Sequence, residues 1–270
     1  MPELPEVETT RRSLLADVVG ARIVAVTVRE RRLRRPVAAE FADQLRGRRV
    51  AGIDRRGKYL LFELDDGRTL LVHLGMSGSL CLTAPSTIPL RHDHVLIDLD
   101  RDRRLVFNDP RRFGLMRVGA RDELEELRTV GPDPLAAAPT LDEWKAMTRG
   151  RKMPIKSLLM DQRLLGGVGN IYANEALFQA GVRPRRRAGS LTRAELARLA
   201  DAVRAVLEHA VALGGSSISD YRDGNGNPGY FQIHHAVYDR DGQPCGQCAA
   251  PIKRLVLSGR STFYCPRCQR

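Results

Sequence analysis

Apolar and polar residues alternate over much of the first 119 residues, a pattern that predicts β-strands. The sequence Asp65-Asp66-Gly67 separates two of these segments and favours a hairpin turn. Because strands at hairpin spacing pair antiparallel, we expect this part of the chain to form an antiparallel β-sandwich. The predicted strands are Ile23–Val28, Tyr59–Leu64, Thr69–Leu74, Val95–Leu99 and Arg104–Phe107.

From about Asp122 onward, apolar residues recur every three to four positions, which predicts helices. The clearest apolar stripe predicts a helix over residues 192–213, and prolines and alanines between Gly131 and Thr140 indicate a linker. The chain is therefore predicted to have an α+β fold. The expected divisions are an N-terminal sandwich over 1–130, a linker region over 131–150, a helical domain over 151–232 and a small C-terminal domain over 236–270.

The charge of the chain indicates a polyanionic partner. Its 270 residues include 44 basic and 32 acidic side chains, a net charge of +12. Nucleic acid is favoured over a membrane surface, because no basic amphipathic anchor is evident. An Arg-rich, Ala-rich composition also follows from a GC-rich genome, so charge alone does not decide. No apolar run has the length of a membrane span and no signal-peptide pattern opens the chain, so we expect a cytoplasmic protein.

Four cysteines near the C-terminus have the spacing of a zinc site. Cys245 and Cys248 form one Cys-x-x-Cys pair, Cys265 and Cys268 form another, and sixteen residues separate the pairs. This spacing is typical of a four-thiolate zinc ribbon. Disulfides are the weaker alternative, since a reducing cytosol opposes them. The fifth cysteine, Cys81, lies in an apolar stretch and is expected to be an inert core thiol.

The segment between the two cysteine pairs is predicted to be a β-hairpin. Ile252–Leu257 and Arg260–Tyr264 would be its strands, with Gly259 supplying the turn and Arg260 at the tip. Metal binding contributes on the order of 10 kcal/mol to the folding of such a small unit, so Arg260 would be held rigidly. Rigid placement suits a phosphate contact, although a solvated turn arginine is the commoner case.

The opening residues Met-Pro-Glu-Leu-Pro-Glu-Val-Glu suggest an amine nucleophile. Removal of Met1 leaves Pro2 with a free secondary amine, followed directly by Glu3. At neutral pH roughly a tenth of a chain-terminal amine is unprotonated, a fraction several hundredfold larger than that of a lysine. An adjacent carboxyl group can also transfer protons for such an amine. Pro5 and Glu6 also have the pattern of a helix start, so a capped amphipathic helix without any chemistry is the simpler alternative.

The sequence Gly166-Gly-Val-Gly-Asn170 lies between two helical patterns. Its glycines would let backbone N–H groups approach a phosphate, and Asn170 would open the next helix. A simple packing corner between helices explains the same residues equally well.

A segment rich in Gly, Ser and Asn, residues 214–232, follows the predicted helix over 192–213. We expect a flexible loop, which either folds over a ligand or is a passive linker.

Several further motifs occur in order along the whole chain. With the opening residues and the four cysteines, they are Arg56-Gly-Lys-Tyr59, His73-Leu-Gly-Met-Ser-Gly78, Asp109-Pro-Arg-Arg-Phe-Gly114, Gly167-Val-Gly-Asn-Ile-Tyr-Ala173 and Gly259-Arg-Ser-Thr. Together these motifs resemble the formamidopyrimidine-DNA glycosylase family of bacterial base-excision enzymes. The Glu-Leu-Pro-Glu-Val opening is similar to this branch rather than to the related endonuclease VIII branch, which typically has Glu-Gly-Pro-Glu. Two positions differ from the family pattern: Gly166 replaces an alanine or valine, and Arg151 replaces a lysine.

The resemblance implies a catalytic set. Pro2 would attack the sugar C1′ of the damaged nucleotide to give a Schiff base, and Glu3 would donate and accept protons. Lys58 would assist the first elimination and Arg260 the second, with Glu6 as a supporting carboxylate.

The resemblance also implies a set of DNA contacts. Met76 and Phe113 would fill the gap left by an extruded nucleotide, and Arg111 would bond the orphaned partner base. The remaining contacts would hold the DNA backbone without reading sequence. They are His73, His92, Arg151, Lys156, Asn170 and Arg260.

The implied protein is a bifunctional DNA glycosylase and abasic-site lyase that excises oxidised purines from duplex DNA in base excision repair. Its divisions would be a catalytic sandwich, a helix-two-turn-helix DNA-binding domain and a zinc finger with one structural Zn²⁺. We expect a monomer that associates with the nucleoid through its DNA binding. Two alternatives stay open: the same chemistry on oxidised pyrimidines, and a non-catalytic lesion-binding zinc protein.

Overall fold

The computed structural model describes residues 1–217 and 221–270, which group into two compact units. The N-terminal unit comprises Met1–Arg128 together with Leu213–Tyr230, and the C-terminal unit comprises Thr129–Ala212 together with Phe231–Arg270. The loop expected over 214–232 includes residues 218–220, which lie outside the described residues. Its part up to Tyr230 groups with the N-terminal unit, whereas the sequence interpretation had placed it with the helical domain.

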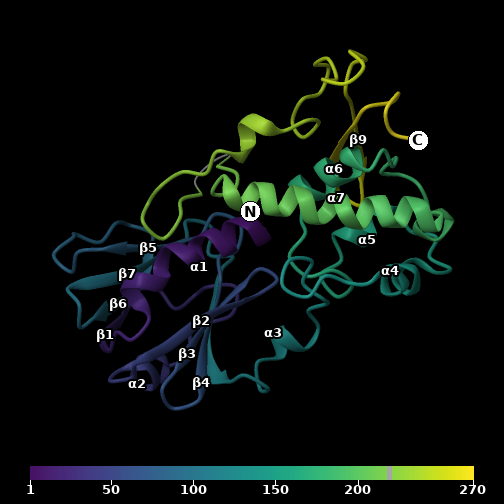
Figure 1. The fold of residues 1–270 in the computed structure, drawn as a ribbon. Helices are drawn as coiled ribbons and strands as arrows, with labels where there is room; N and C mark the ends of the chain where they lie inside the picture. The colour runs from purple at the N-terminus through teal and green to yellow at the C-terminus, as the bar shows by residue number, and fades with distance from the viewer. Residues whose placement is uncertain (218–220) are drawn as a thin grey trace. The chain divides into compact units, whose positions relative to one another are not determined.

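Two four-stranded antiparallel sheets form the body of the N-terminal unit among its described residues (Figure 1). The first has the order β1 (Ile23–Val28), β6 (Asp93–Leu99), β7 (Arg103–Asn108) and β5 (Ser79–Thr83). The second has the order β2 (Val50–Arg56), β3 (Tyr59–Leu64), β4 (Arg68–His73) and β8 (Leu115–Ala120). The predicted antiparallel sandwich is confirmed, and it also contains β2, β5 and β8, which the alternation did not reveal.

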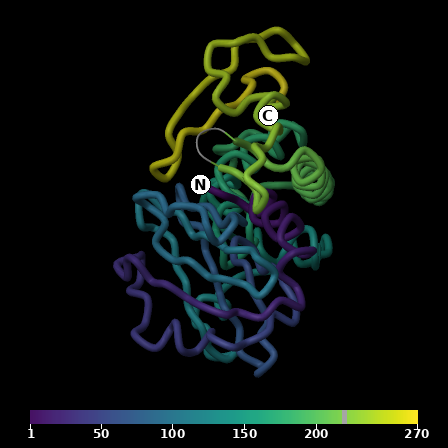
Figure 2. The backbone as a smooth tube through the Cα atoms, turned by 90° about the vertical axis from the view of Figure 1, so that its left-hand side faces the viewer, coloured from purple at the N-terminus to yellow at the C-terminus, as the bar shows by residue number. Residues whose placement is uncertain are grey.

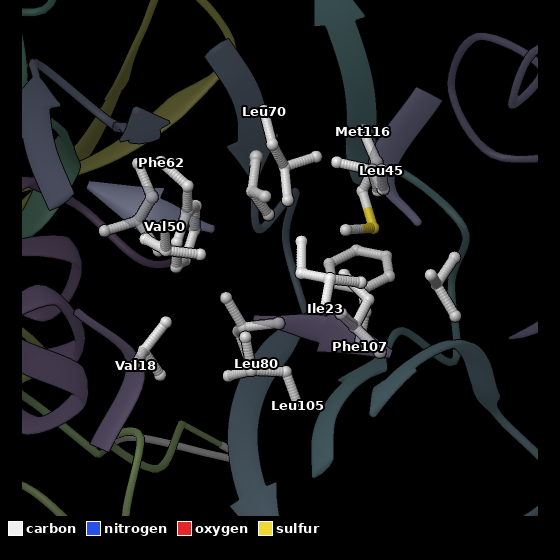
Figure 3. Packing of buried hydrophobic residues seen from close by; sticks show 14 of the residues in the cluster. Val18, Ile23, Leu45, Val50, Phe62, Leu70, Leu80, Leu105, Phe107 and Met116 are labelled. Atoms are coloured by element: carbon white, nitrogen blue, oxygen red, sulfur yellow. The ribbon is translucent and has the colours of Figure 1, made fainter. Parts of the chain in front are cut away.

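The inner faces of the two sheets share one apolar core (Figure 3). Ile23 and Phe107 come from the first sheet, and Phe62, Leu70 and Met116 come from the second. The helices α1 (Leu4–Val18) and α2 (Phe41–Leu45) add residues to the same core.

The outer face of the second sheet is apolar as well. Leu61 and Leu71 alternate with the inward-facing residues of their strands. They pack against Leu127 of α3 (Glu125–Arg128) and against Leu124, directly before this helix. Burial on both faces explains why β3 is an almost continuous apolar run rather than a strict alternation.

The C-terminal unit is helical up to the cysteines. It contains α4 (Leu141–Thr148), α5 (Ile155–Leu159), α6 (Asn170–Gln179), the 3-10 turns Ala188–Ser190 and Phe231–His234, and α7 (Arg193–Ala212). The helix predicted over 192–213 is confirmed as α7, and a capping box between Thr192 and Glu195 fixes its start. The predicted linker region over 131–150 contains α4, whose start is capped by Thr140 and Glu143.

The last two strands of the chain form the hairpin that was predicted between the cysteine pairs (Figure 2). β9 (Lys253–Leu257) pairs antiparallel with β10 (Arg260–Tyr264), and Leu257 is opposite Arg260. Ser258 and Gly259 form the two-residue turn, with φ angles of 47° and 71°. Two positive φ angles in succession define a type I′ turn, which matches the twist of a hairpin and places Arg260 at the tip.

Candidate active site and nucleic-acid interface

The residues proposed for amine chemistry lie at the N-terminus of α1. Glu3 is the N-cap of this helix, and its backbone N–H donates to Glu6 Oε2 at 2.7 Å in a capping box. Leu4 is the first helical residue and Pro5 the second, one position later than expected. Pro2 and Glu3 are buried, whereas Met1 is 48% exposed. The helix dipole places partial positive charge at this end, which disfavours an ammonium group and stabilises a carboxylate.

Glu6 connects the start of α1 to the segment after α7. While Glu6 Oε2 caps the helix, its Oε1 accepts the N–H of Ser216 at 2.7 Å. The Tyr221 hydroxyl donates to the backbone oxygen of Glu6 at 2.8 Å, and burial raises the pKa of this phenol. The segment is therefore bonded to α1 on both sides of residues 218–220. Of the two expectations for it, a passive linker fits these contacts poorly.

Lys58 lies in the turn between β2 and β3 and is only 6% exposed. Gly57 beside it has a φ of 57°, and Arg55 Nη1 donates to the Gly57 oxygen at 3.1 Å. Arg55 Nε also donates to Glu8 Oε2 of α1 at 2.9 Å. The helix that carries Pro2 and the turn that carries Lys58 are therefore joined by one buried ion pair.

Glu8 is ionised in this setting. Burial alone would raise its pKa, but hydrogen bonds from Arg11, Arg12 and Arg55 outweigh burial and lower the pKa to about 2.

His73 faces Tyr59 across the β3–β4 pair, with the two ring centroids 4.9 Å apart. Burial, reinforced by the positive charges of Lys58 and Arg34, lowers the pKa of His73 to about 4. Its Nδ1 accepts the backbone N–H of Gly75 at 3.0 Å, so the neutral ring carries its proton on Nε2. His73 therefore offers a hydrogen-bond donor without a full positive charge.

The three residues expected to fill a gap in duplex DNA come from two loops of the N-terminal unit. Met76 follows β4 and is half-buried, while Arg111 and Phe113 lie between β7 and β8 and are exposed. Phe113 is 46% exposed, which is unusual for a large apolar ring and fits a contact surface. The guanidinium carbon of Arg111 lies 4.9 Å from the Phe113 ring centre.

His92 lies in the loop before β6 and lines a polar cavity of about 510 Å³. Three guanidinium groups, of Arg29, Arg91 and Arg112, line the same cavity and outnumber the carboxylates of Glu30 and Asp93 there.

Asn170 is the first residue of α6, as predicted, and Gly169 is the N-cap. The N-terminus of a helix carries partial positive charge, which suits a phosphate. Two N–H groups of the glycine turn are used internally. Gly166 donates to the Pro132 oxygen at 2.9 Å, and Gly167 donates to Gln162 Oε1 at 2.8 Å. The first half of this turn is therefore a packing corner between helices.

Gly166, which replaces the alanine or valine of the family pattern, is closely packed. A Cβ atom there would lie 2.9 Å from Val130 Cγ1 and 3.0 Å from the Gly131 oxygen, so an alanine would require the neighbouring segment to move.

Lys156 differs from its expected role as a surface contact to the DNA backbone. It is 1% exposed, and its Nζ donates to the Ser261 oxygen and to Thr262 Oγ1, both at 2.8 Å. It therefore ties α5 to β10, the strand that begins with Arg260. Arg151 is exposed and its Nε donates to the Met147 oxygen at 2.6 Å, and Arg260 is exposed at the hairpin tip.

Asn174 is a residue that the sequence interpretation missed. It is fully buried in α6, where its Nδ2 donates to the Asn170 oxygen at 2.6 Å and its Oδ1 accepts the Phe263 N–H of β10 at 2.8 Å. It lies four residues after Asn170, but an asparagine inside a helical pattern gives no signal that it bonds a distant strand.

The four C-terminal cysteines form a zinc site. Their sulfur atoms all lie within 4.8 Å of one another, with Cys245 and Cys268 Sγ 3.9 Å apart and Cys248 and Cys265 Sγ 3.4 Å apart. Zn–S bonds of about 2.3 Å at tetrahedral angles place sulfurs about 3.8 Å apart, so the thiolates fit one structural Zn²⁺. Cys81 is not part of this cluster; it is partly buried, and its thiol donates to the Asp223 oxygen at 3.2 Å.

Family models match almost the whole chain in three consecutive parts. Residues 1–116 match the formamidopyrimidine-DNA glycosylase N-terminal domain, and residues 130–222 match the formamidopyrimidine-DNA glycosylase H2TH domain. Residues 242–270 match the zinc finger found in FPG and IleRS. The chain belongs to the formamidopyrimidine-DNA glycosylase family. The resemblance inferred from the motifs is thereby confirmed, and so are the expected fold class and structural zinc.

Curated relatives and solved structures agree with this family assignment. Formamidopyrimidine-DNA glycosylase of Halorhodospira halophila is 49% identical and that of Methylococcus capsulatus 47% identical, each over the full length of both chains. The crystal structure of the MutM (Fpg) protein from Thermus thermophilus is 46% identical with a TM-score of 0.89, covering 99% of this chain and 98% of that one. A complex between Lactococcus lactis Fpg and DNA containing an abasic site is 33% identical with a TM-score of 0.91, covering 99% of each chain.

The described helices of this formamidopyrimidine-DNA glycosylase family member do not have the properties of membrane-spanning helices. None of the described helices combines the length and the apolar character that a bilayer crossing requires.

Proposed function

We propose that this protein is a DNA glycosylase and abasic-site lyase that removes oxidised purines from duplex DNA. The observation that carries the proposal is the placement of Pro2 and Glu3 at the buried N-terminus of α1, in a chain of the formamidopyrimidine-DNA glycosylase family. Two relatives that align with this chain over their full length are named formamidopyrimidine-DNA glycosylase. A further relative has been solved in complex with DNA that contains an abasic site.

The first chemical step belongs to Pro2 once Met1 is removed. The secondary amine attacks C1′ of the damaged nucleotide and the base leaves with the bonding electrons. The C1′–O4′ bond then breaks and O4′ takes up a proton, so that the ring-opened sugar and the amine form an iminium ion. Glu3, as the adjacent carboxyl group, moves the protons that this exchange requires. Glu6 supports the site by capping the helix and by holding the segment that contains Ser216.

The lyase steps require groups that handle protons and phosphates. Lys58, joined to α1 through Arg55 and Glu8, assists the first elimination, and Arg260 at the rigid hairpin tip assists the second. His73, His92, Arg151 and Asn170 hold the sugar-phosphate backbone. Lys156 contributes to DNA binding indirectly: its buried ammonium group fixes β10, the strand that begins with Arg260.

The damaged nucleotide must leave the base stack before Pro2 can reach it, at a cost of a few kcal/mol. Met76 and Phe113 fill the gap that it leaves, and Arg111 bonds the partner base. Contacts to the DNA backbone are not sequence-specific, so the protein acts on lesions in any sequence context. It acts as a monomer on nucleoid DNA in the cytoplasm.

Borohydride trapping tests this function. The purified protein, shown by mass spectrometry to lack Met1, is incubated with duplex DNA containing 8-oxoguanine and then reduced. A covalent protein–DNA complex is expected, and the Pro2→Gly variant, which presents a primary amine in place of the secondary one, should give much less. If the zinc-loaded protein forms no trapped species, the proposal fails. A parallel duplex with an oxidised pyrimidine decides between the two substrate classes, and we expect slower trapping on it.

A further inference from the structure

One buried carboxyl group holds both loops that carry the gap-filling residues. Asp109 is 0% exposed, its Oδ1 accepts the Ser77 hydroxyl at 3.0 Å, and its Oδ2 accepts the Gly114 N–H at 2.7 Å. Ser77 directly follows Met76, and Gly114 directly follows Phe113. Each oxygen of Asp109 therefore bonds the residue next to one member of the apolar pair.

The two loops also touch through their backbones. A Cβ atom at Gly75 would lie 2.5 Å from both the Gly114 nitrogen and the Phe113 carbonyl carbon. A Cβ atom at Gly114 would lie 2.5 Å from Phe107 Cζ in the sandwich core and 3.0 Å from the His73 oxygen. The loops can approach this closely only because both positions are glycine, so they behave as one body resting on the core.

The backbone of Asp109 is itself fixed from three sides. Its N–H donates to the His92 oxygen at 3.0 Å, and its oxygen accepts the Arg112 N–H at 3.1 Å. His94 Nε2 lies 2.8 Å from the same oxygen, and because a carbonyl can only accept, this nitrogen must carry the ring proton. Arg112 has a φ of 57°, a left-handed conformation that a non-glycine residue adopts only when its surroundings impose it.

We propose that Asp109 is a positioning residue for opening the base stack: its two oxygens set Met76 and Phe113 in one fixed register, so that both enter the duplex together. This inference rests on the proposed function and adds a residue to it. Asp109 contacts no DNA in this role; it acts only through Ser77 and Gly114. A rigid pair of wedges loses less conformational entropy on insertion than two independent loops would, and the same bonds that order the loops in the free protein provide that saving.

Three substitutions test the two hydrogen bonds of the Asp109 carboxyl group separately. Asp109→Ala removes both bonds and leaves the Gly114 N–H buried without an acceptor. Asp109→Asn can keep both, since its oxygen accepts from Gly114 while its amide donates to the Ser77 oxygen. Ser77→Ala removes only the hydrogen bond from the Met76 loop to Asp109, at a half-buried site where a lost hydroxyl is tolerated. Asp98→Asn is the matched control, because Asp98 is paired with Arg104 on β6 and β7, away from both loops.

Insertion is measured by stopped-flow fluorescence of 2-aminopurine placed beside a tetrahydrofuran abasic analogue in duplex DNA. Wild type and Asp98→Asn should give the same rapid rise. Ser77→Ala should insert roughly tenfold more slowly, the effect of one lost charge-assisted hydrogen bond, and Asp109→Ala more slowly still. Asp109→Asn should recover most of the wild-type rate. Borohydride trapping on a single-stranded abasic oligonucleotide, which has no stack to open, should stay within about twofold of wild type for every variant.

The outcomes decide separately between this inference and the proposed function. Insertion at the wild-type rate in Ser77→Ala and Asp109→Ala overturns the positioning role. Equal losses on the duplex and the single strand overturn it as well, because they indicate general damage to the fold. If Asp109→Ala does not fold, the insertion rates of Ser77→Ala and Asp109→Asn still test the positioning role. Failure of wild type to be trapped on the single strand would instead refute the proposed function itself.

Discussion

Arg55 Nε donates to Glu8 Oε2 at 2.9 Å, and both side chains are at least nine-tenths buried. This ion pair joins the second turn of α1 to the end of β2, directly before the turn that holds Lys58. Glu8 also accepts from Arg11 and Arg12 on its own helix, so one carboxylate is surrounded by three guanidinium groups. The pair is the structural link between the nucleophile and the lysine proposed for the first elimination.

Breaking this pair should destabilise the N-terminal unit strongly. Arg55→Met removes the buried partner of Glu8 but leaves Arg11 and Arg12. The loss should therefore approach, without reaching, the cost of an uncompensated buried charge, which is about 3–5 kcal/mol. Arg12→Ala is the control, since Arg12 bonds the same carboxylate from a 60% exposed side chain and should cost at most about 0.5 kcal/mol. Denaturant unfolding of both variants measures the difference. Similar losses in the two would show that burial does not govern this contact.

The same carboxylate should make stability depend on acid. The pKa of Glu8 is lowered to about 2 from an ordinary value of 4.5, so the unfolded state takes up a proton first as the pH falls. The contribution of Glu8 is therefore fully present above about pH 5 and is lost between pH 4.5 and 2. The free energy of unfolding of wild type minus that of Glu8→Gln should be constant from pH 5 to 7 and shrink below pH 4.5. A difference that is independent of pH down to 2.5 would contradict this prediction.

His73 should remain neutral at physiological pH. Its pKa is lowered to about 4, so the unfolded state gains its proton near pH 6.5 while the folded state does not. Stability should fall as the pH drops from 6.5 toward 4, and His73→Asn should remove that part of the slope. A histidine-selective NMR titration gives the pKa directly. A midpoint near 6.5 would mean that the ring binds DNA as a cation instead of through a neutral Nε2–H.

Catalytic and binding residues should separate cleanly in mutational tests. Glu3→Gln should abolish base release while duplex affinity stays within about twofold, because the role proposed for Glu3 is proton transfer and not phosphate neutralisation. Arg260→Ala should weaken binding to every sequence and reduce the salt dependence of binding by about one phosphate contact. Arg204→Ala, which removes an exposed arginine paired with Glu208 on α7, is the control and should change neither property. Affinity measured at several salt concentrations, with single-turnover base release, distinguishes the two classes.

Zinc removal should weaken DNA binding through the hairpin. Without metal, the core around Cys245, Ile252 and Phe263 is too small to hold β9 and β10, so Arg260 loses its fixed position. Cys248→Ser should bind less than one equivalent of zinc and show weakened duplex affinity. Cys81→Ser, which alters the cysteine outside the cluster, should retain one equivalent and full affinity. A chromophoric chelator measures the zinc, and unchanged affinity in metal-free Cys248→Ser would contradict the prediction.

Local patterns in the sequence were sufficient for the features that depend on neighbouring residues. The sandwich, α7, the hairpin turn at Gly259 and the cysteine cluster each follow from spacing, because alternation, helical period and ligand geometry act over short distances.

Buried polar residues could not be predicted from such local patterns. Lys156 resembles a surface lysine in sequence, yet its ammonium bonds a strand more than a hundred residues away. Asp109 was noticed only as part of a motif, and Asn174 was not noticed at all, because their partners lie in other elements. The segment before Tyr230 has the composition of a flexible linker, since nothing in its sequence shows that Ser216 and Tyr221 bond Glu6.

Asn174 should set the position of Arg260 relative to Asn170. Asn174→Leu removes the acceptor for the Phe263 N–H, which leaves one buried backbone group unsatisfied at about 1–3 kcal/mol. It also removes the side-chain donor to the Asn170 oxygen, which keeps its hydrogen bond within the α6 backbone. The hairpin should stay folded around its zinc but shift relative to α6, so duplex affinity should fall and the second elimination should slow. Gel analysis of the cleaved strand should then show an excess of the first elimination product over the second. Gln179→Ala, at an exposed amide near the end of the same helix, should leave the product ratio unchanged. A normal product ratio in zinc-replete Asn174→Leu would show that Arg260 finds its position without this bridge.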